Sequence, residues 1–125
     1  MAQFSTALRN ARLAAITTAV GTNGRFRVYD SEDTLLADLA CSATFAAEPS
    51  DGVLTANPIT QDFADASGVA AYAQVCKSDG TPVIRLTVSE AGQGGDAIIN
   101  DVHIVQGGVV SVTSLTITEG NAGLA

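Results

Sequence analysis

The sequence lacks most of the side chains on which common catalytic and metal sites depend. Its 125 residues include no Trp, one His and two Cys. The two thiols, Cys41 and Cys76, are far apart in the chain and have no His beside them, so they do not form the paired ligands of a structural zinc site. His103 has no nucleophile elbow to serve, because no G-x-S-x-G sequence is present. We therefore expect no enzyme, no metal and no cofactor, and an ordinary strand position for His103.

Motifs for phosphate and calcium are missing as well, although one loop has a related composition. Residues 90–101 combine carboxylates with glycines, as calcium loops do. They lack the spaced acids of an EF-hand and the Gly-Lys-Ser/Thr ending of a phosphate-binding loop. We expect a flexible acidic loop here and leave ion binding open.

Long apolar runs and a leader pattern are also missing. No apolar stretch approaches the roughly 18 residues that a membrane-spanning helix needs. No basic segment followed by an apolar one opens the chain. We expect neither export nor a membrane partner. In a reducing compartment Cys41 and Cys76 are then expected to be two buried free thiols, with a disulfide left open.

Charge is unevenly distributed along the chain. The formal net charge is −7, yet residues 1–29 carry Arg9, Arg12, Arg25 and Arg27 and no acid. The remaining residues carry all thirteen acids and only two basic side chains. A net acidic body does not favour binding to a phosphate backbone, so we expect no nucleic-acid partner. The arginines either pair locally on a solvated surface or form an assembly surface that meets acidic groups of a partner.

The beginning of the chain predicts one helix. Ser5 or Thr6 is a suitable cap, and good helix formers follow up to Gly21. At 100° per residue the helix has an apolar stripe on which an arginine also lies. Its members are Leu13, Ile16, Val20 and Arg9, with Arg12 at the edge. Either the arginine stems cover apolar surface with their heads in water, or this face docks on another chain. The candidate partner interface consists of Arg9, Arg12, Leu13, Ile16, Arg25 and Arg27.

After residue 24 the apolar residues recur at every second position, which predicts short strands. The expected strands are residues 25–29, 34–39, 53–55, 59–63, 69–77, 82–89, 97–99, 102–105 and 109–118, with 42–45 either continuing the second strand or starting another. In the last strand the buried parity changes near Thr113 and Ser114, which predicts a bulge or a change of sheet. About eight short strands indicate a mainly β protein, an antiparallel β-sandwich or jelly roll. We expect a single domain over residues 1–125, with the helix and turn at 1–23, the sandwich at 24–118 and a tail at 119–125.

Short stretches spread along the chain carry a resemblance to a known family. They are residues 8–11 and 13–16, then 27–30, 35–39, 52–57, 68–72 and 77–80, and finally 110–121, the most distinctive of them. In this order they resemble a family of small structural proteins encoded in the virion modules of tailed bacteriophages and prophages. The resemblance implies a virion component, assembled in the bacterial cytoplasm, and brings no catalytic motif.

Three roles follow from these observations. The first is a capsid decoration, or cement, protein that binds the major capsid protein, copies of itself, or both. The second is a structural protein of the tail or the head–tail junction. The third is a module that binds a host glycan, which a jelly roll would permit, although its loops carry almost no aromatic residues. We favour decoration, because an acidic body facing solvent and a basic amino-terminal segment facing a lattice suit a cement protein.

Overall fold

The helix near the amino terminus forms as the sequence predicts. The structure, a computed structural model, describes residues 5–118, and in it α1 spans Thr6–Val20. Ser5 caps the helix, because its Oγ accepts a hydrogen bond from the backbone N–H of Leu8 at 3.2 Å. Gly21 ends it with a left-handed φ. The predicted tail at 119–125 lies outside the described residues.

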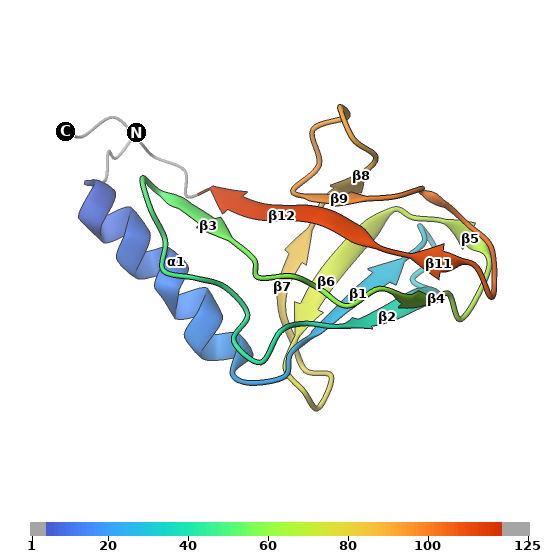
Figure 1. Cartoon of the computed structure of the whole chain (residues 1–125), viewed down its shortest axis with the longest axis horizontal. Coiled ribbons are helices and arrows are strands. Elements are labelled where there is room, and N and C mark those ends of the chain that lie inside the picture. The colour runs from blue at the N-terminus through green and yellow to red at the C-terminus, as the bar shows by residue number, and fades with distance from the viewer. Residues whose placement is uncertain (1–4, 119–125) are drawn as a thin grey trace.

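Two four-stranded sheets form the body of the domain (Figure 1). The first sheet has the order β2-β1-β6-β7 and contains β1 (Arg25–Tyr29), β2 (Leu35–Ala40), β6 (Tyr72–Cys76) and β7 (Pro82–Leu86). The second has the order β3-β12-β9-β8 and contains β3 (Val53–Thr55), β8 (Val88–Ser89), β9 (Ala97–Ile99) and β12 (Val112–Thr118). Two ribbons, β10-β5 and β11-β4, contain β4 (Asp62–Phe63), β5 (Gly68–Val69), β10 (His103–Ile104) and β11 (Val109–Val110). All pairs are antiparallel except β8 with β9. In Figure 1 the ribbons lie at the end of the domain opposite α1.

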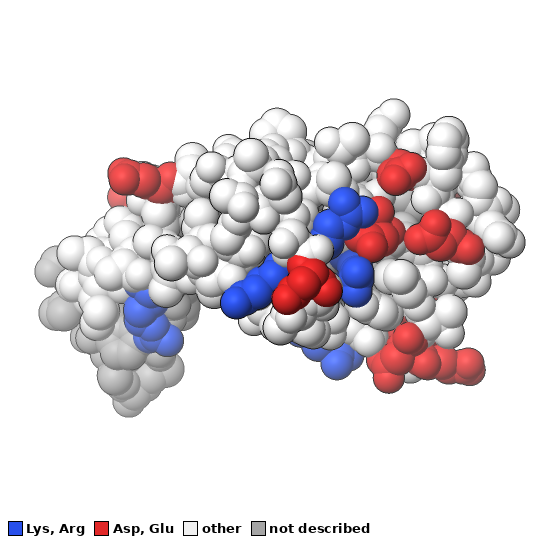
Figure 2. All heavy atoms as spheres, turned by 90° about the horizontal axis from the view of Figure 1, so that it is seen from below, with Lys and Arg blue, Asp and Glu red and all other residues white. Residues whose placement is uncertain are grey.

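Buried and partly exposed side chains alternate along β1 of the first sheet, which gives this strand a polar outer face. On β1, Phe26 and Val28 are fully buried, whereas Arg25, Arg27 and Tyr29 are half-buried. Figure 2 views the molecule from below and shows basic groups gathered near the middle, with only acidic groups toward the end away from the helix. On this face both signs of charge are therefore present near the middle and at the helix end, and only acidic groups lie at the opposite end.

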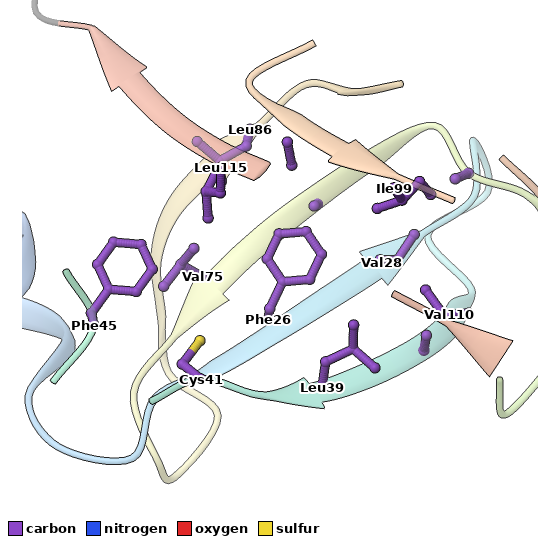
Figure 3. Close-up of a cluster of buried hydrophobic side chains, with 14 of the residues drawn as sticks. Phe26, Val28, Leu39, Cys41, Phe45, Val75, Leu86, Ile99, Val110 and Leu115 are labelled. Carbon is purple, nitrogen blue, oxygen red and sulfur yellow. The ribbon is translucent and has the colours of Figure 1, made fainter. Parts of the chain in front are cut away.

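The core lies between the two sheets (Figure 3). Phe26 of β1 is opposite Leu39 of β2 on one side and Val75 of β6 on the other, and all three are fully buried. Leu115 of β12 and Ile99 of β9 meet them from the second sheet. Burying one such side chain contributes about 1.5–3 kcal/mol, so these contacts hold the two sheets together.

The predicted change of parity in the last strand is confirmed. Val110 of β11 and Leu115 of β12 are both buried although they have opposite parity. The register against β9 shifts between Val112 and Ser114, and the chain passes from pairing with β4 to pairing with β9 and β3. Thr113 is the extra residue of this bulge. It lets the segment from β11 to β12 pair first in a ribbon and then in the second sheet.

The prediction of a mainly β domain with one amino-terminal helix is confirmed, since strands make up 43% and helix 13% of the structure. The number of strands is corrected: the described residues form twelve, not about eight. The difference arises because three predicted strands are interrupted, at residues 70–71, at Thr87 and at Ser111. Residues 42–45 form no strand and contribute only an isolated bridge between Thr44 and Thr22.

Candidate protein-binding surfaces

The six residues of the predicted partner interface occupy two different environments. On α1, Leu13 is 1% exposed and Ile16 is half-buried against the core, whereas Arg12 is exposed. Arg25 and Arg27 lie on the outer face of β1. Leu13 is thus a core residue of its own domain, and contact of the arginines with a partner stays a prediction.

Arg9 is buried within its own domain. Its side chain lies against the backbone of Gly52, and its Nη2 donates a hydrogen bond to Oγ1 of Thr6 at 3.1 Å. The N–H of Gly52 donates to Oδ1 of Asn10 at 2.9 Å, which fixes the turn at residues 50–53 over the helix. Among the described residues, the Nε of Arg9 has no hydrogen-bond partner. The Arg9 side chain is thus largely enclosed by its own domain, with its guanidinium against this turn, and its contact with a partner stays a prediction.

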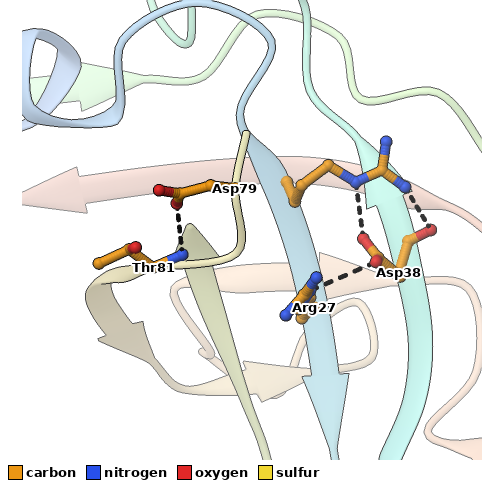
Figure 4. A network of polar contacts seen from close by, with 5 residues as sticks. Arg27, Asp38, Asp79 and Thr81 are labelled. Atoms are coloured by element: carbon orange, nitrogen blue, oxygen red, sulfur yellow. Dashed lines mark hydrogen bonds and ion pairs between the residues drawn. The ribbon is translucent and has the colours of Figure 1, made fainter. Parts of the chain in front are cut away.

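The two arginines of β1 share one carboxylate (Figure 4). The Nε of Arg25 lies 2.8 Å from Oδ1 of Asp38, and the Nε of Arg27 lies 3.3 Å from Oδ2. The Nη2 of Arg25 also donates to the backbone carbonyl of Asp38. Asp38 faces Arg27 across the β1–β2 ladder, so the sheet register itself creates the cluster. The local pairing that the sequence left open for these two arginines is therefore present.

A stack of side chains continues this face across β1, β6 and β7. The rings of Tyr29 and Tyr72 stack with centroids 5.1 Å apart, and the guanidinium carbon of Arg85 lies 3.7 Å from the centroid of Tyr72. The hydroxyl of Tyr72 donates to Oδ1 of Asp33 at 2.5 Å. This hydrogen bond to Asp33 and the burial of the group raise the pKa of Tyr72. The stack was not predicted from the sequence, because it depends on which residues of three strands lie side by side.

The two cysteines are free and buried, as predicted. Burial raises the pKa of the Cys41 thiol to about 11 and also raises that of Cys76. A thiol with a raised pKa carries little thiolate at neutral pH and reacts slowly. Both side chains therefore act as small core residues.

Exposed apolar side chains gather at the end of the domain opposite α1. Among residues 5–118, five large apolar side chains are exposed, and four of them lie on or beside the two ribbons. These four are Phe63, Val69, Val105 and Val109, which are 63%, 54%, 68% and 45% exposed. We call them the distal surface. A patch of this kind on an otherwise polar surface is typical of a protein-binding site.

Backbone pairing supports the residues of the distal surface. Phe63 of β4 lies directly opposite Val109 of β11, and Val69 of β5 lies opposite His103 of β10. The β4–β11 ribbon continues beyond its two strands, because the N–H of Ala64 donates to the carbonyl of Gly108 and its carbonyl accepts from the N–H of Gly107. The apolar residues thus sit on hydrogen-bonded backbone, which favours a preformed surface.

A hollow of about 190 Å³ opens beside these residues. It is lined by Asn100, Asp101, His103, Ile104, Val105, Gly108, Val109 and Val110. Asn100 is held in place, because its Nδ2 donates to the carbonyl of Val109 and its Oδ1 accepts from the N–H of Ser111. The hollow gives the distal surface a recess with a mixed apolar and polar lining, into which an anchoring side chain of a partner could fit.

His103 is exposed on β10, in the strand position predicted for it. In the acidic loop at residues 90–101, Glu90 accepts a hydrogen bond from the N–H of Val102, and Asp96 accepts from the N–H and hydroxyl of Thr87. Within residues 5–118 there is no group of three or more His, Cys, Asp or Glu side chains placed to hold a metal ion. The loop carboxylates instead fix the local backbone.

Comparison with known proteins returns no match: no protein family, no curated protein and no solved structure is similar enough to this chain to be identified. In the part of the chain that the structure describes, no helix has the length and apolar character needed to cross a membrane.

Sequence reasoning missed the distal surface. Phe63 and Val69 were expected in strands of five and nine residues, within which alternation would have assigned them a buried or an exposed face. In the structure each lies in a strand of only two residues, so its direction follows from the partner strand instead. The available signal was Pro58 and the glycines at 68, 107 and 108, which break these segments into short pieces.

Proposed function

We propose that the chain is a non-enzymatic structural protein of a tailed-phage virion, and that it decorates the capsid by docking its distal surface on the shell. The resemblance described above supports a virion component. The distal surface supports a role based on protein–protein contact. A decoration protein needs a small, rigid domain with at least one surface that binds the capsid. The packed β-sandwich with the distal surface at one end meets this requirement.

The observation that carries the proposal is the grouping of Phe63, Val69, Val105 and Val109 at one end of the domain. Together they would withdraw a large apolar area from water on docking, which is the main driving force of protein association. The center of a protein interface is typically apolar and depleted of charge. The other exposed large apolar residue of the described part, Leu8, lies on α1 at the opposite end and offers no such group.

The experiment compares particle occupancy of variants in virions of the phage that encodes the chain. A fourfold variant, Phe63→Thr with Val69→Thr, Val105→Thr and Val109→Thr, removes the apolar surface while keeping residues that favour strands. We expect the purified variant to stay folded and its copy number in particles, measured by quantitative mass spectrometry, to fall at least tenfold. Leu8→Gln is the matched control, since it removes an exposed apolar residue from a helix and should leave occupancy unchanged.

Normal occupancy of the fourfold variant would overturn docking through this surface. If the fourfold variant does not fold, Phe63→Thr and Val105→Thr are measured singly. These two residues are the most exposed of the four, so their replacement has the smallest effect on packing. Occupancy in purified tails instead of capsids would support the tail role.

A further inference from the structure

The distal surface is surrounded by acidic residues. Asp62 precedes Phe63 on β4, and Asp65 follows it two residues later. Asp101 lines the hollow beside Val105. All three carboxylates are exposed. We call these three carboxylates, which lie on or next to the segments of the distal surface, its negative rim.

A second acidic group reinforces the rim. The turn between β1 and β2 contains Asp30, Glu32 and Asp33. It lies beside the ribbons, because the Asp30 carboxylate approaches Gly68 of β5. The segments that build the distal surface, residues 59–70 and 96–113, contain no Lys or Arg. Figure 2 shows the result on one face, where the end away from the helix bears acidic groups and no basic ones.

We propose that the distal surface docks on a protein surface that is apolar at its center and lined with Lys and Arg, and that the hollow receives one of those basic side chains. This inference rests on the proposed function and adds the chemistry of the partner. Complementary charge across an interface steers the encounter and fixes the orientation of the partners. On a capsid lattice, Lys and Arg side chains around the docking site would favour binding of this acidic end of the domain over its other surfaces.

The same charges argue against other occupants. A phosphate backbone or an anionic lipid surface would be repelled by Asp62, Asp65 and Asp101, because the segments that carry them contain no Lys or Arg. A second copy docking through the same surface would bring the two negative rims together, which is unfavourable. A second copy docking through its arginine face would meet Arg25 and Arg27, whose two positive charges are reduced to one by Asp38.

The hollow has the features that a lysine or arginine side chain needs. Val105, Val109 and Ile104 provide apolar walls for the aliphatic stem. Asp101 provides a carboxylate for the charged head. Only one hydrogen bond within residues 5–118 uses that carboxylate, from the N–H of His103 to Oδ1 at 2.8 Å. The other carboxylate oxygen of Asp101 can therefore accept a hydrogen bond from the partner.

The test separates the contribution of the acidic side chains from that of the apolar side chains of the distal surface. A threefold variant, Asp62→Asn with Asp65→Asn and Asp101→Asn, removes the charge but keeps the side-chain oxygens that accept from the N–H groups of Phe63 and His103. The matched control is Glu48→Gln with Asp51→Asn and Asp79→Asn. It changes net charge by the same amount in loops near the helix end of the domain. Asn also suits position 51, where φ is 53°.

Binding of each purified protein to particles that lack the chain is measured from about 50 to 500 mM NaCl, a range over which exposed charges become screened. We expect wild-type association to slow with salt, the threefold Asp variant to associate about tenfold more slowly at low salt with little salt dependence, and the control to behave as wild type.

The outcomes distinguish the two proposals. If the Asp variant binds as wild type while the fourfold Thr variant does not bind, the basic partner is wrong and the docking surface stands. If both variants bind as wild type, the docking surface itself is wrong. Concentration-dependent self-association of the isolated chain, abolished in the fourfold Thr variant, would identify a second copy as the occupant and overturn the inference.

Discussion

The guanidinium of Arg9 lies so close to Gly52 that a Cβ at position 52 would overlap it. Arg9 is the amino-terminal member of the helix stripe, and Gly52 has a φ of 75° in the turn before β3. The hydrogen bond from Gly52 to Asn10 lies next to this contact. These two contacts attach the helix to the second sheet, because the same turn leads directly into β3.

We predict that Gly52→Ala lowers the free energy of unfolding by about 2–4 kcal/mol, through left-handed strain of about 1–2 kcal/mol together with displacement of Arg9. Gly92→Ala is the control, since Gly92 has a similar φ of 86° but no atom within 4 Å of the added Cβ. Chemical denaturation of both variants isolates the Arg9 contact. Equal losses in the two variants would mean that the contact contributes nothing.

We predict that Arg9→Glu destabilises the domain by about 3 kcal/mol, because it places an unpaired carboxylate in a buried position. Arg9→Met should cost less, since it keeps an apolar stem in the same space. Arg12→Glu, at an exposed position, should change stability by less than about 1 kcal/mol. The measurement is the thermal midpoint of each variant, and an Arg9→Glu protein as stable as wild type would show that this side chain is not held in the domain. The partner role of the helix arginines is therefore tested with Arg12→Glu.

The helix and most strands could be predicted from the sequence, because local signals determine them. The cap at Ser5, the period change after Gly24 and the parity change near Thr113 each correspond to an observed feature. The burial of Arg9 could not be predicted, because it depends on a distant turn whose Gly52 N–H donates to Asn10, 42 residues earlier in the chain. Arg9 was correctly assigned to the apolar stripe, but what covers that stripe is decided by tertiary contacts.

We predict that stability declines as the pH rises above about 9. The pKa of Cys41 is near its ordinary value of 9.0 in the unfolded chain and about 11 in the folded domain, so the folded state holds the proton more tightly. Its contribution is complete below pH 9 and is lost as the pH rises through 11. Denaturation at pH 8 and pH 10.5 should show a smaller loss for Cys41→Ala than for wild type. The remaining loss comes from Cys76 and Tyr72, whose pKa values are also raised. An identical loss in the variant would contradict the burial of Cys41.

We predict that Arg85 and Tyr72 are energetically coupled. Arg85→Ala should lower the melting temperature of the wild type by about 2–4 °C but have little effect in a Tyr72→Leu background, where the ring is absent. Gln74→Ala is a suitable control for loss of a half-buried polar side chain on the same face. Additive effects of the Arg85 and Tyr72 changes would exclude the cation–π contact as a stabilising one.

The distal surface was beyond sequence reasoning for a different physical reason. Alternation assigns a face only when several residues extend in one strand, and here each ribbon strand has two. Phe63 and Val109 become neighbours through pairing between segments 46 residues apart. The negative charge of this end was visible in the composition, because residues 30–125 hold all thirteen acids. The composition did not show that this negative charge lies beside an apolar patch.

The central claim is that the ribbon end of the domain, opposite α1, rests on the capsid shell. Electron cryo-microscopy of the virion, at a resolution that separates α1 from the sheets, tests it most directly. We predict density for the domain on the outer shell, with Phe63 and Val105 against the capsid protein, basic side chains of that protein near Asp62 and Asp101, and α1 pointing away. Density with α1 against the shell and the ribbon end in solvent, or density confined to the tail, would contradict the account.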